Sequence, residues 1–300
     1  MLAPRRESLV TRYNGAMTPN PLVDVRTLAR ELDRADWVVV DCRFTLTAPE
    51  AGKAAYDRGH IPGARYAHLD NDLSRRPRAD EGRHPLPDRE RFAATLGVWG
   101  IQAGDRVVAY DEGSGAIAAR LWWMLGWLGH ERRAVLDGGF AAWQEAGLPI
   151  EQTQPTVGAR RYEPRRARSV GVVATGEVAR RQAEGDLLVD ARAAPRYRGE
   201  QESIDSKAGH VPGARNRPFS ANVTPTGRFR PPGELRSELT ELLGGRSPDR
   251  LIAMCGSGVT ACHLLLAMDV ARLFGGQLYA GSWSEWIRDP TRPIATGGEP

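Results

Sequence analysis

The sequence predicts an α/β protein of two similar domains, each a parallel β-sheet flanked by α-helices. Short apolar runs such as WVVVD (37–41) and RVVAY (106–110) are typical of strands that helices cover on both faces. Apolar residues recur at helical spacing between and after these runs, and alternating strands and helices favour a parallel sheet. The same order of elements occurs twice along the 300 residues.

Four motifs of the first half return in the second half in the same order, which indicates a tandem duplication. Their offsets lie between 143 and 150 residues. The matching pairs are WVVVDCR (37–43) with DLLVDAR (186–192), GHIPGAR (59–65) with GHVPGAR (209–215), DRVVAYDEGSGAIAAR (105–120) with DRLIAMCGSGVTACHL (249–264), and DGGFAAW (137–143) with AGSWSEW (280–286).

The individual elements follow from these patterns. In the first half we expect the strands above and helices over 88–100 and 116–129. In the second half we expect strands over 187–190 and 251–254 and helices over 233–244 and 259–274. The predicted organisation is a disordered leader (1–17), an N-terminal domain (18–150), a Pro- and Arg-rich linker (151–170) and a C-terminal domain (171–300).

Composition narrows the class of protein. The formal net charge is only +4, and no basic tail or stripe is present, so a nucleic-acid partner is not expected. No uncharged apolar run reaches about 18 residues, so no membrane span is expected. Three cysteines form no disulfide framework, which predicts a reducing, cytoplasmic location. We expect a monomer, because the two halves can bury their apolar faces on each other.

Cys255 stands where the apolar run 251–254 ends, directly before a predicted helix. The residues that must turn the chain are Gly256, Ser257, Gly258, Val259 and Thr260. Glycines allow successive backbone N–H groups to converge on one point, where the N-terminal end of a helix also favours negative charge. The sulfur should therefore be stabilised as a thiolate or a persulfide. A buried cysteine beside an incidental turn would leave unexplained why the turn begins at the cysteine.

The motif CGSGVTACH, in the second of two repeats that each carry GH(I/V)PGA, resembles the rhodanese-fold sulfurtransferases over residues 20–295. The resemblance implies two rhodanese-like domains, with Cys255 as the catalytic nucleophile of the second. It also implies that Cys255 takes a sulfur atom from a small anionic donor as a persulfide. The acceptor would be cyanide, a small thiol or a thioredoxin-like dithiol, and neither a cofactor nor a metal would be required.

Comparison of the halves separates scaffold from chemistry. Asp111 replaces the cysteine in the first half, so we expect that half to be inactive, with Asp111 helping to close the domain interface or, alternatively, acting in catalysis. His60 and His210 occur in both halves, which favours a structural role. The alternative, suggested by the resemblance, is a relay between His60 and Ser257. Further residues are predicted to be structural: the repeated pairs Asp41/Arg43 and Asp190/Arg192, the repeated Trp143 and Trp286, and the cysteines Cys42 and Cys262.

Arg196 has no counterpart in the first half, and the resemblance implies that it binds the substrate. A guanidinium can bind a carboxylate or a sulfonate through two hydrogen bonds. The alternative is an ordinary solvated loop arginine. Arg198 is a weaker candidate, and Lys207 is the only cation in the following loop, 201–209, where a second arginine is often found in such enzymes.

The loop sequence also bears on the donor. Thiosulfate enzymes of this family usually carry Arg and Lys after the cysteine, whereas this chain has Gly256 and Ser257. This favours 3-mercaptopyruvate as donor, with thiosulfate as the alternative. Phosphatases of the same fold need an arginine after five intervening residues, a position held here by Ala261, so they are disfavoured. A non-catalytic sulfur carrier is a further alternative.

Overall fold

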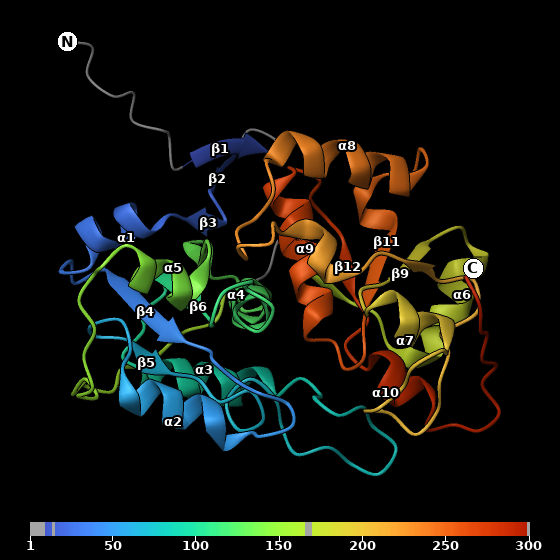
Figure 1. Cartoon of the computed structure of the whole chain (residues 1–300), viewed down its shortest axis with the longest axis horizontal. Coiled ribbons are helices and arrows are strands. Elements are labelled where there is room, and N and C mark those ends of the chain that lie inside the picture. Colours follow the sequence, from blue (N-terminus) through green and yellow to red (C-terminus); the bar gives the residue numbers. More distant parts are fainter. Residues whose placement is uncertain (1–9, 14–15, 166–169, 299–300) are drawn as a thin grey trace.

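The computed structural model describes residues 10–13, 16–165 and 170–298. It contains two parallel five-stranded sheets, one in each half of the chain, which lie side by side in Figure 1. The first sheet has the order β3-β7-β6-β4-β5, and the second has the corresponding order β8-β12-β11-β9-β10. The predicted α/β class and the repetition are therefore confirmed.

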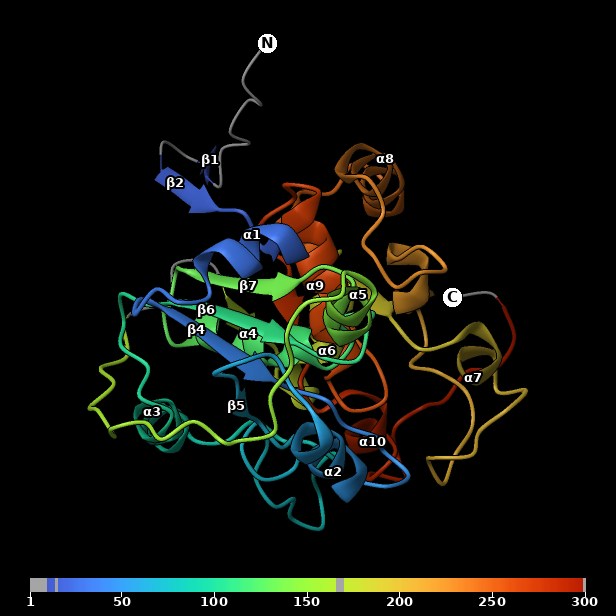
Figure 2. The same cartoon turned by 60° about the vertical axis from the view of Figure 1, so that its left-hand side comes forward.

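The central strands coincide with the predicted apolar runs. In the first sheet β4 (Trp37–Asp41) pairs with β6 (Arg106–Tyr110), and in the second β9 (Leu187–Asp190) pairs with β11 (Leu251–Met254). Figure 2 shows β4, β6 and β7 running in the same direction. The outer strands are β3 (Leu22–Val23), β5 (Arg65–Tyr66), β7 (Arg133–Leu136), β8 (Gly171–Val172), β10 (Arg215–Asn216) and β12 (Gln277–Leu278).

Helices cover both faces of each sheet, because alternate strand residues point to opposite sides. In the first domain Val39 packs with helices α1, α2 and α5, while Val38 and Val40 pack with α3 and α4. These helices are α1 (Val25–Glu31), α2 (Glu50–Arg58), α3 (Arg89–Val98), α4 (Ala118–Trp127) and α5 (Gly139–Glu145). The second domain has α6 (Val178–Ala183), α7 (Ala194–Arg198), α8 (Pro232–Leu243), α9 (Thr260–Val270) and α10 (Ser282–Trp286).

The two domains are joined through α4 and α9, which are packed against each other in the middle of the molecule. Both helices are apolar on nearly all sides, and nine of the ten residues of α4 are buried. One continuous hydrophobic core therefore extends from the first sheet into the second. Burial of each large aliphatic side chain contributes roughly 1.5–3 kcal/mol, so this contact holds the domains together firmly.

The segment between the domains is ordered along the first domain. The Arg160 N–H donates to the Gly97 carbonyl at 2.8 Å, and the Tyr162 side chain is buried. A Cβ at Gly97 would lie 2.3 Å from the Arg160 oxygen, so this close approach requires glycine. Residues 166–169 of the predicted linker lie outside the described part of the chain.

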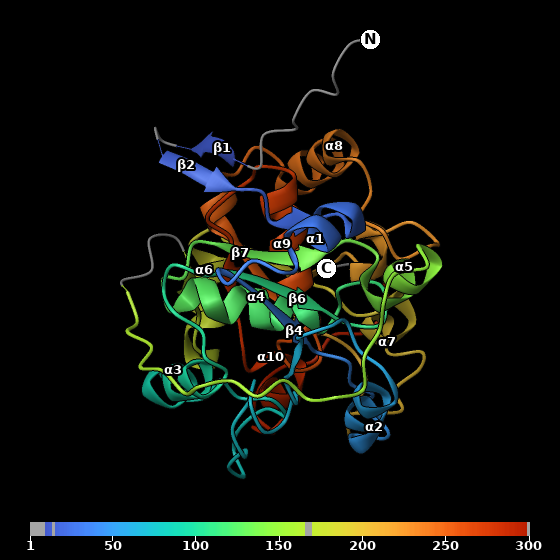
Figure 3. The ribbon, with the colours of Figure 1, turned by 90° about the vertical axis from the view of Figure 1, so that its left-hand side faces the viewer.

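The predicted disordered leader is partly wrong. β1 (Val10–Tyr13) and β2 (Ala16–Pro19) form an antiparallel pair, which Figure 3 shows at the periphery of the molecule. The sequence 10–19 lacks the apolar run that marked the sheet strands, so the pattern did not reveal it. Residues 1–9 and 14–15 of the leader lie outside the described residues. None of the helices in the described residues is long and apolar enough to cross a membrane.

Candidate active site

Cys255 lies at the carboxyl end of β11, where α/β proteins bind their ligands, and its side chain is only 2% exposed. The Gly258 N–H donates to the Cys255 sulfur at 3.1 Å. Gly258 has a φ of +75°, and a Cβ there would lie 2.4 Å from the Ala280 oxygen. The loop after the cysteine therefore needs glycine to direct its N–H group at the sulfur.

The equivalent loop of the first domain follows β6 and surrounds Asp111. Two N–H groups donate to its Oδ1 (Gly113, 3.0 Å; Gly115, 2.9 Å), and two to its Oδ2 (Ile117, 2.8 Å; Ala118, 3.3 Å). The carboxylate is thus bound by its own loop, which corrects the expectation that Asp111 closes the domain interface. An aspartate fits this position because its oxygens can accept all the converging N–H groups.

The two loops differ in length by one residue. Gly115 (φ +78°) lies four residues after Asp111, whereas Gly258 (φ +75°) lies three after Cys255. The ungapped alignment of the two loops is therefore wrong beyond Glu112. In the corrected alignment Gly115 corresponds to Gly258, and the N–H of each donates to the residue that ends the strand.

Ser257 forms part of a chain of polar contacts that crosses the domain interface. Its hydroxyl lies 2.7 Å from His84 Nδ1, and His84 Nε2 lies 3.1 Å from Asp70 Oδ1. Since a carboxylate can only accept, Nε2 carries the proton, and Nδ1 accepts from the serine. Burial lowers the pKa of His84 although Asp70 opposes this, and the bond to His84 lowers the pKa of Asp70. The imidazole is therefore neutral at pH 7, as in a Ser-His-Asp triad.

The alternative relay through His60 is wrong. His60 Nδ1 lies 2.8 Å from the Tyr56 carbonyl, and its ring stacks on Tyr56 at 3.8 Å. His210 has the same contacts with Tyr197, at the same distances. The two histidines therefore have the structural role that their repetition predicted.

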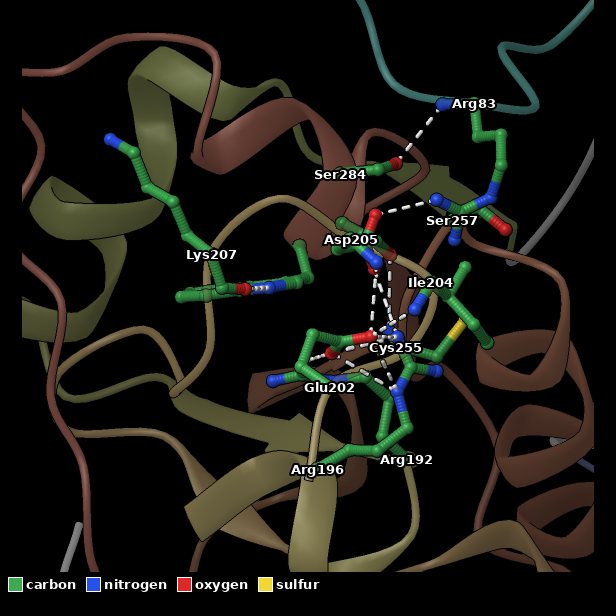
Figure 4. A network of polar contacts seen from close by, with 12 residues as sticks. Arg83, Arg192, Arg196, Glu202, Ile204, Asp205, Lys207, Cys255, Ser257 and Ser284 are labelled. Atoms are coloured by element: carbon green, nitrogen blue, oxygen red, sulfur yellow. Dashed lines mark hydrogen bonds and ion pairs between the residues drawn. The ribbon is translucent and has the colours of Figure 1, made fainter. Parts of the chain in front are cut away.

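Arg196 lies beside the cysteine loop, within the network shown in Figure 4. Its guanidinium binds both oxygens of Glu202, at 2.9–3.2 Å, and Asp205 Oδ2 at 2.9 Å. The other oxygen of Asp205 binds Arg83 Nη1 at 2.5 Å. Asp205 is 3% exposed at its side chain and joins two arginines from different domains.

Both arginines also face the cysteine loop. A Cβ at Gly256 would lie 3.2 Å from Arg83 Nη2 and 3.6 Å from Arg196 Nη1. Arg83 is thus the second cation near Cys255 that the sequence reading did not find. Lys207 is not this second cation, because its side chain points away from Cys255 in Figure 4. Arg198 binds the exposed Glu200 instead.

Other predicted residues have the structural roles assigned to them. The Asp41/Arg43 and Asp190/Arg192 pairs are buried with the same shortest distance, 2.7 Å. The remaining members of this group, Cys42, Cys262, Trp143 and Trp286, are buried in the core. Within the described residues no cluster of three or more His, Cys, Asp or Glu side chains could hold a metal ion.

The sequence reading missed Asp70, Arg83 and His84, which lie between β5 and α3, in a segment without hydrophobic periodicity. One signal was available. The stretch GRHPLP (82–87) matches GRFRPP (227–232) of the second half, with His84 opposite Phe229. Because His84 has no counterpart in the second half, it could have been predicted to have a functional role, such as a contact with the cysteine loop of the other domain.

The fold places Cys255 in a loop at the carboxyl end of a parallel strand, where the Gly258 N–H donates to its sulfur. The family model for the rhodanese-like domain matches residues 20–146 and 174–289. The chain therefore belongs to the rhodanese family. Its named relatives identify it further as a sulfurtransferase.

Relatives of known name cover nearly the whole chain. A Pseudomonas aeruginosa protein named "Probable 3-mercaptopyruvate sulfurtransferase" is 46% identical over 94% of this chain and 100% of its own length. A Mycobacterium tuberculosis protein named "Putative thiosulfate sulfurtransferase SseB" is 38% identical over 92% of this chain and 97% of its own. The crystal structure of SseA from Escherichia coli, described as a 3-mercaptopyruvate sulfotransferase, is 31% identical with a TM-score of 0.76, covering 89% of this chain and 100% of that one.

Proposed function

We propose that the protein transfers a sulfur atom from 3-mercaptopyruvate to a thiol or to cyanide through a persulfide on Cys255. The observation that carries this proposal is the chain Asp70–His84–Ser257 beside the Cys255 loop. This chain can move a proton, and 3-mercaptopyruvate is the donor that has a thiol proton to move. Thiosulfate carries no such proton at neutral pH.

The hydrogen bonds of the Asp111 carboxylate indicate how the Cys255 loop would bind a persulfide. The Asp111 Oδ2 atom lies two bonds beyond Cβ, as the terminal sulfur of a cysteine persulfide does. It accepts from the N–H groups of Ile117 and Ala118 at the start of α4. By the corrected alignment, the N–H groups of Thr260 and Ala261 at the start of α9 would bind the terminal sulfur, and Gly258 would bind the inner one.

The donor's carboxylate would be bound by Arg83 and Arg196. Asp205 and Glu202 hold the two guanidiniums in place through Arg83 Nη1 and Arg196 Nη2. The other terminal nitrogens, Arg83 Nη2 and Arg196 Nη1, face Gly256. Within the described residues the buried Arg83 Nε has no hydrogen-bond partner, so the guanidinium retains capacity for an anion. A carboxylate held there would place the donor's thiol near Cys255.

The chemical steps balance as follows. The Cys255 thiolate attacks the donor's sulfur, the carbon–sulfur bond breaks, and its electron pair forms the enolate of pyruvate. The proton of the donor's thiol passes through Ser257 to His84 and back to the enolate carbon, giving pyruvate and a negatively charged persulfide. Cyanide or a thiolate then attacks the terminal sulfur and leaves as thiocyanate or a persulfide, regenerating the Cys255 thiolate.

Thiosulfate is the second candidate donor. The paired guanidiniums suit a sulfonate as well as a carboxylate, and one relative is named for thiosulfate. The two donors are separated by measuring kcat/KM for both on the same preparation. We expect 3-mercaptopyruvate to be preferred at least tenfold, and a preference for thiosulfate would contradict the assignment.

The persulfide itself is tested by mass spectrometry of donor-treated protein. The peptide that contains Cys255 should gain the mass of one sulfur atom, and cyanide should remove it. Addition at Cys42 or Cys262 instead, or at no cysteine, would overturn the proposed mechanism.

We also propose a thioredoxin-like dithiol as an acceptor, a monomeric state and a cytoplasmic location. The monomer is supported by the single core that α4 and α9 form between the domains. The location is supported by the three cysteines, all of which are free and buried. Gel filtration with light scattering tests the monomer.

A further inference from the structure

Arg120, in α4 of the inactive domain, is fully buried. Its guanidinium donates to three backbone carbonyls: Nε and Nη2 to Leu73 at 3.4 and 3.3 Å, Nη2 also to His84 at 3.0 Å, and Nη1 to Gly258 at 3.2 Å. It also has a side-chain hydrogen bond with Cys262. This guanidinium therefore connects the segment that carries His84 with the loop that carries Cys255.

A buried guanidinium keeps its charge, and burying a charge without a partner is costly. In the described part of the chain, Arg120 has no carboxylate within ion-pair distance, unlike the buried Arg43 and Arg192. Burial lowers the pKa of Arg120, and the groups that oppose this effect are Cys262 and Cys255. Burial raises the pKa of Cys262 to about 12, so its thiol is neutral near pH 7, and Cys255 is the sulfur of this pair that can carry a compensating negative charge.

The bond to Gly258 also fixes the loop. Gly258 donates through its N–H to the Cys255 sulfur, while its carbonyl accepts from Arg120 and from the Cys262 thiol, the latter at 3.3 Å. In a trans peptide the C=O and the following N–H point in opposite directions. Holding the Gly258 carbonyl on the side of α4 therefore fixes the orientation of the Gly258–Val259 peptide, directly after the N–H that donates to the sulfur.

The other domain provides a natural comparison. His263 lies five residues after Gly258, as Arg120 lies five residues after Gly115, and it crosses the interface in the opposite direction. Its Nε2 lies 2.9 Å from the Ser114 carbonyl in the Asp111 loop. Burial lowers the pKa of His263 to about 4, so this contact carries no charge at neutral pH. The charged member of the pair faces the cysteine, and the neutral one faces the aspartate.

We propose that Arg120 is a positioning residue for catalysis: it orients the Cys255 loop against His84 and supplies the buried positive charge that stabilises the anionic sulfur. This inference rests on the proposed function only in taking Cys255 as the nucleophile. The inactive domain would then contribute to the site a permanent charge in addition to its proton relay.

Arg120→Lys and Arg120→Gln separate charge from hydrogen bonding, because both side chains can donate to a carbonyl and only lysine is charged. The readout is the rate at which iodoacetamide alkylates Cys255 at pH 7, followed on the Cys255 peptide. We expect Arg120→Gln to react about tenfold more slowly than the native protein and Arg120→Lys to recover most of the rate. The kcat values should follow the same order, while the donor's KM changes less, since Arg83 and Arg196 remain.

His263→Gln is the matched control, and circular dichroism with thermal unfolding checks the fold of each variant. We expect His263→Gln to lose stability without slowing alkylation. Equal rates in the Lys and Gln variants, a similar slowing in His263→Gln, or failure of both Arg120 variants to fold would overturn the proposal. Alkylation requires no donor, so these outcomes are independent of which donor the enzyme uses.

Discussion

The loops around Asp111 and Cys255 have nearly the same backbone but different chemistry. Each follows the central strand of its sheet and turns at a glycine with positive φ, whose N–H donates to the side chain directly after the strand. In the first domain a carboxylate accepts four of these bonds permanently. In the second, the sulfur accepts one such bond, from Gly258, and the proposed persulfide would accept the others during turnover.

The residues that cover each loop come from the opposite domain. His84 and Arg120 contact the Cys255 loop, whereas Phe229 and His263 lie against the Asp111 loop. An imidazole and a charged guanidinium thus contact the Cys255 loop, whereas an aromatic ring and a neutral imidazole contact the Asp111 loop. The comparison teaches that the proposed nucleophile lies in one half of the chain, while the residues proposed to assist it lie in the other half.

The largest expected effect comes from the residue that differs most between the loops. Cys255→Ser should reduce sulfur transfer by more than about a thousandfold while the protein stays folded, because no other group can carry the sulfur. Asp111→Ser is the matched change in the other loop and should retain transfer. Steady-state assays with both donors measure this, and turnover by Cys255→Ser would remove the cysteine from the mechanism.

His84→Phe would place an aromatic ring against the Cys255 loop, as Phe229 lies against the Asp111 loop. Because proton transfer through Ser257 is lost, kcat with 3-mercaptopyruvate should fall about a hundredfold or more. Transfer from thiosulfate should change much less, since it needs no proton transfer to the donor's carbon. An equal loss with both donors would show that His84 acts on the loop geometry rather than on the proton.

Arg196→Ala should raise the KM for the anionic donor about tenfold or more, from the loss of a charge-assisted hydrogen bond of roughly 1.5–3 kcal/mol. The maximal rate should change less. Arg198→Ala, an exposed arginine on the same helix, is the control. Unchanged donor kinetics in Arg196→Ala would refute its assignment.

The pH profile should reflect His84. Because burial lowers the pKa of His84 below its usual 6.5, the neutral, proton-accepting form persists at pH 6.5 and is lost only at lower pH. The rate with 3-mercaptopyruvate should therefore stay level between pH 8 and 7 and fall only at a pH below 6.5, by up to about tenfold per pH unit. A profile that already falls between pH 8 and 7 would contradict this protonation state.

The smallest effect on activity is expected for Asp111→Ala. The variant leaves N–H groups of the loop without their acceptor, so the free energy of unfolding should drop by about 1–3 kcal/mol. Urea titration measures this loss. Sulfur transfer should stay within a few-fold of the native rate, and its disappearance would show that the first loop takes part in the reaction.

Much of the fold could be predicted because it depends on local patterns. The strands 37–41, 106–110, 187–190 and 251–254 were read to the residue, since uninterrupted apolar runs mark buried parallel strands. Cys255 was found because its turn begins at the cysteine itself. The helices extended one to four residues less than predicted at some ends, where the apolar pattern continues into the caps.

The rest of the candidate site depends on contacts between domains. Ser257 and His84 are 173 positions apart in sequence, and no periodicity relates the coil that holds His84 to the cysteine loop. The family resemblance suggested His60 as the relay histidine, yet its motif recurs in the second half, and both copies bind backbone carbonyls in the same way. The partners of Arg196 were equally hidden, since Glu202 and Asp205 read as ordinary loop acids.

The contact between α4 and α9 limits how far the chain can be truncated. A fragment beginning at residue 171 would retain the nucleophile and its turn of glycines. It would lose Asp70, Arg83, His84 and Arg120 together, and would expose the apolar side of α9 to water. If these residues act as proposed, sulfur transfer requires both domains, although the cysteine lies in only one of them.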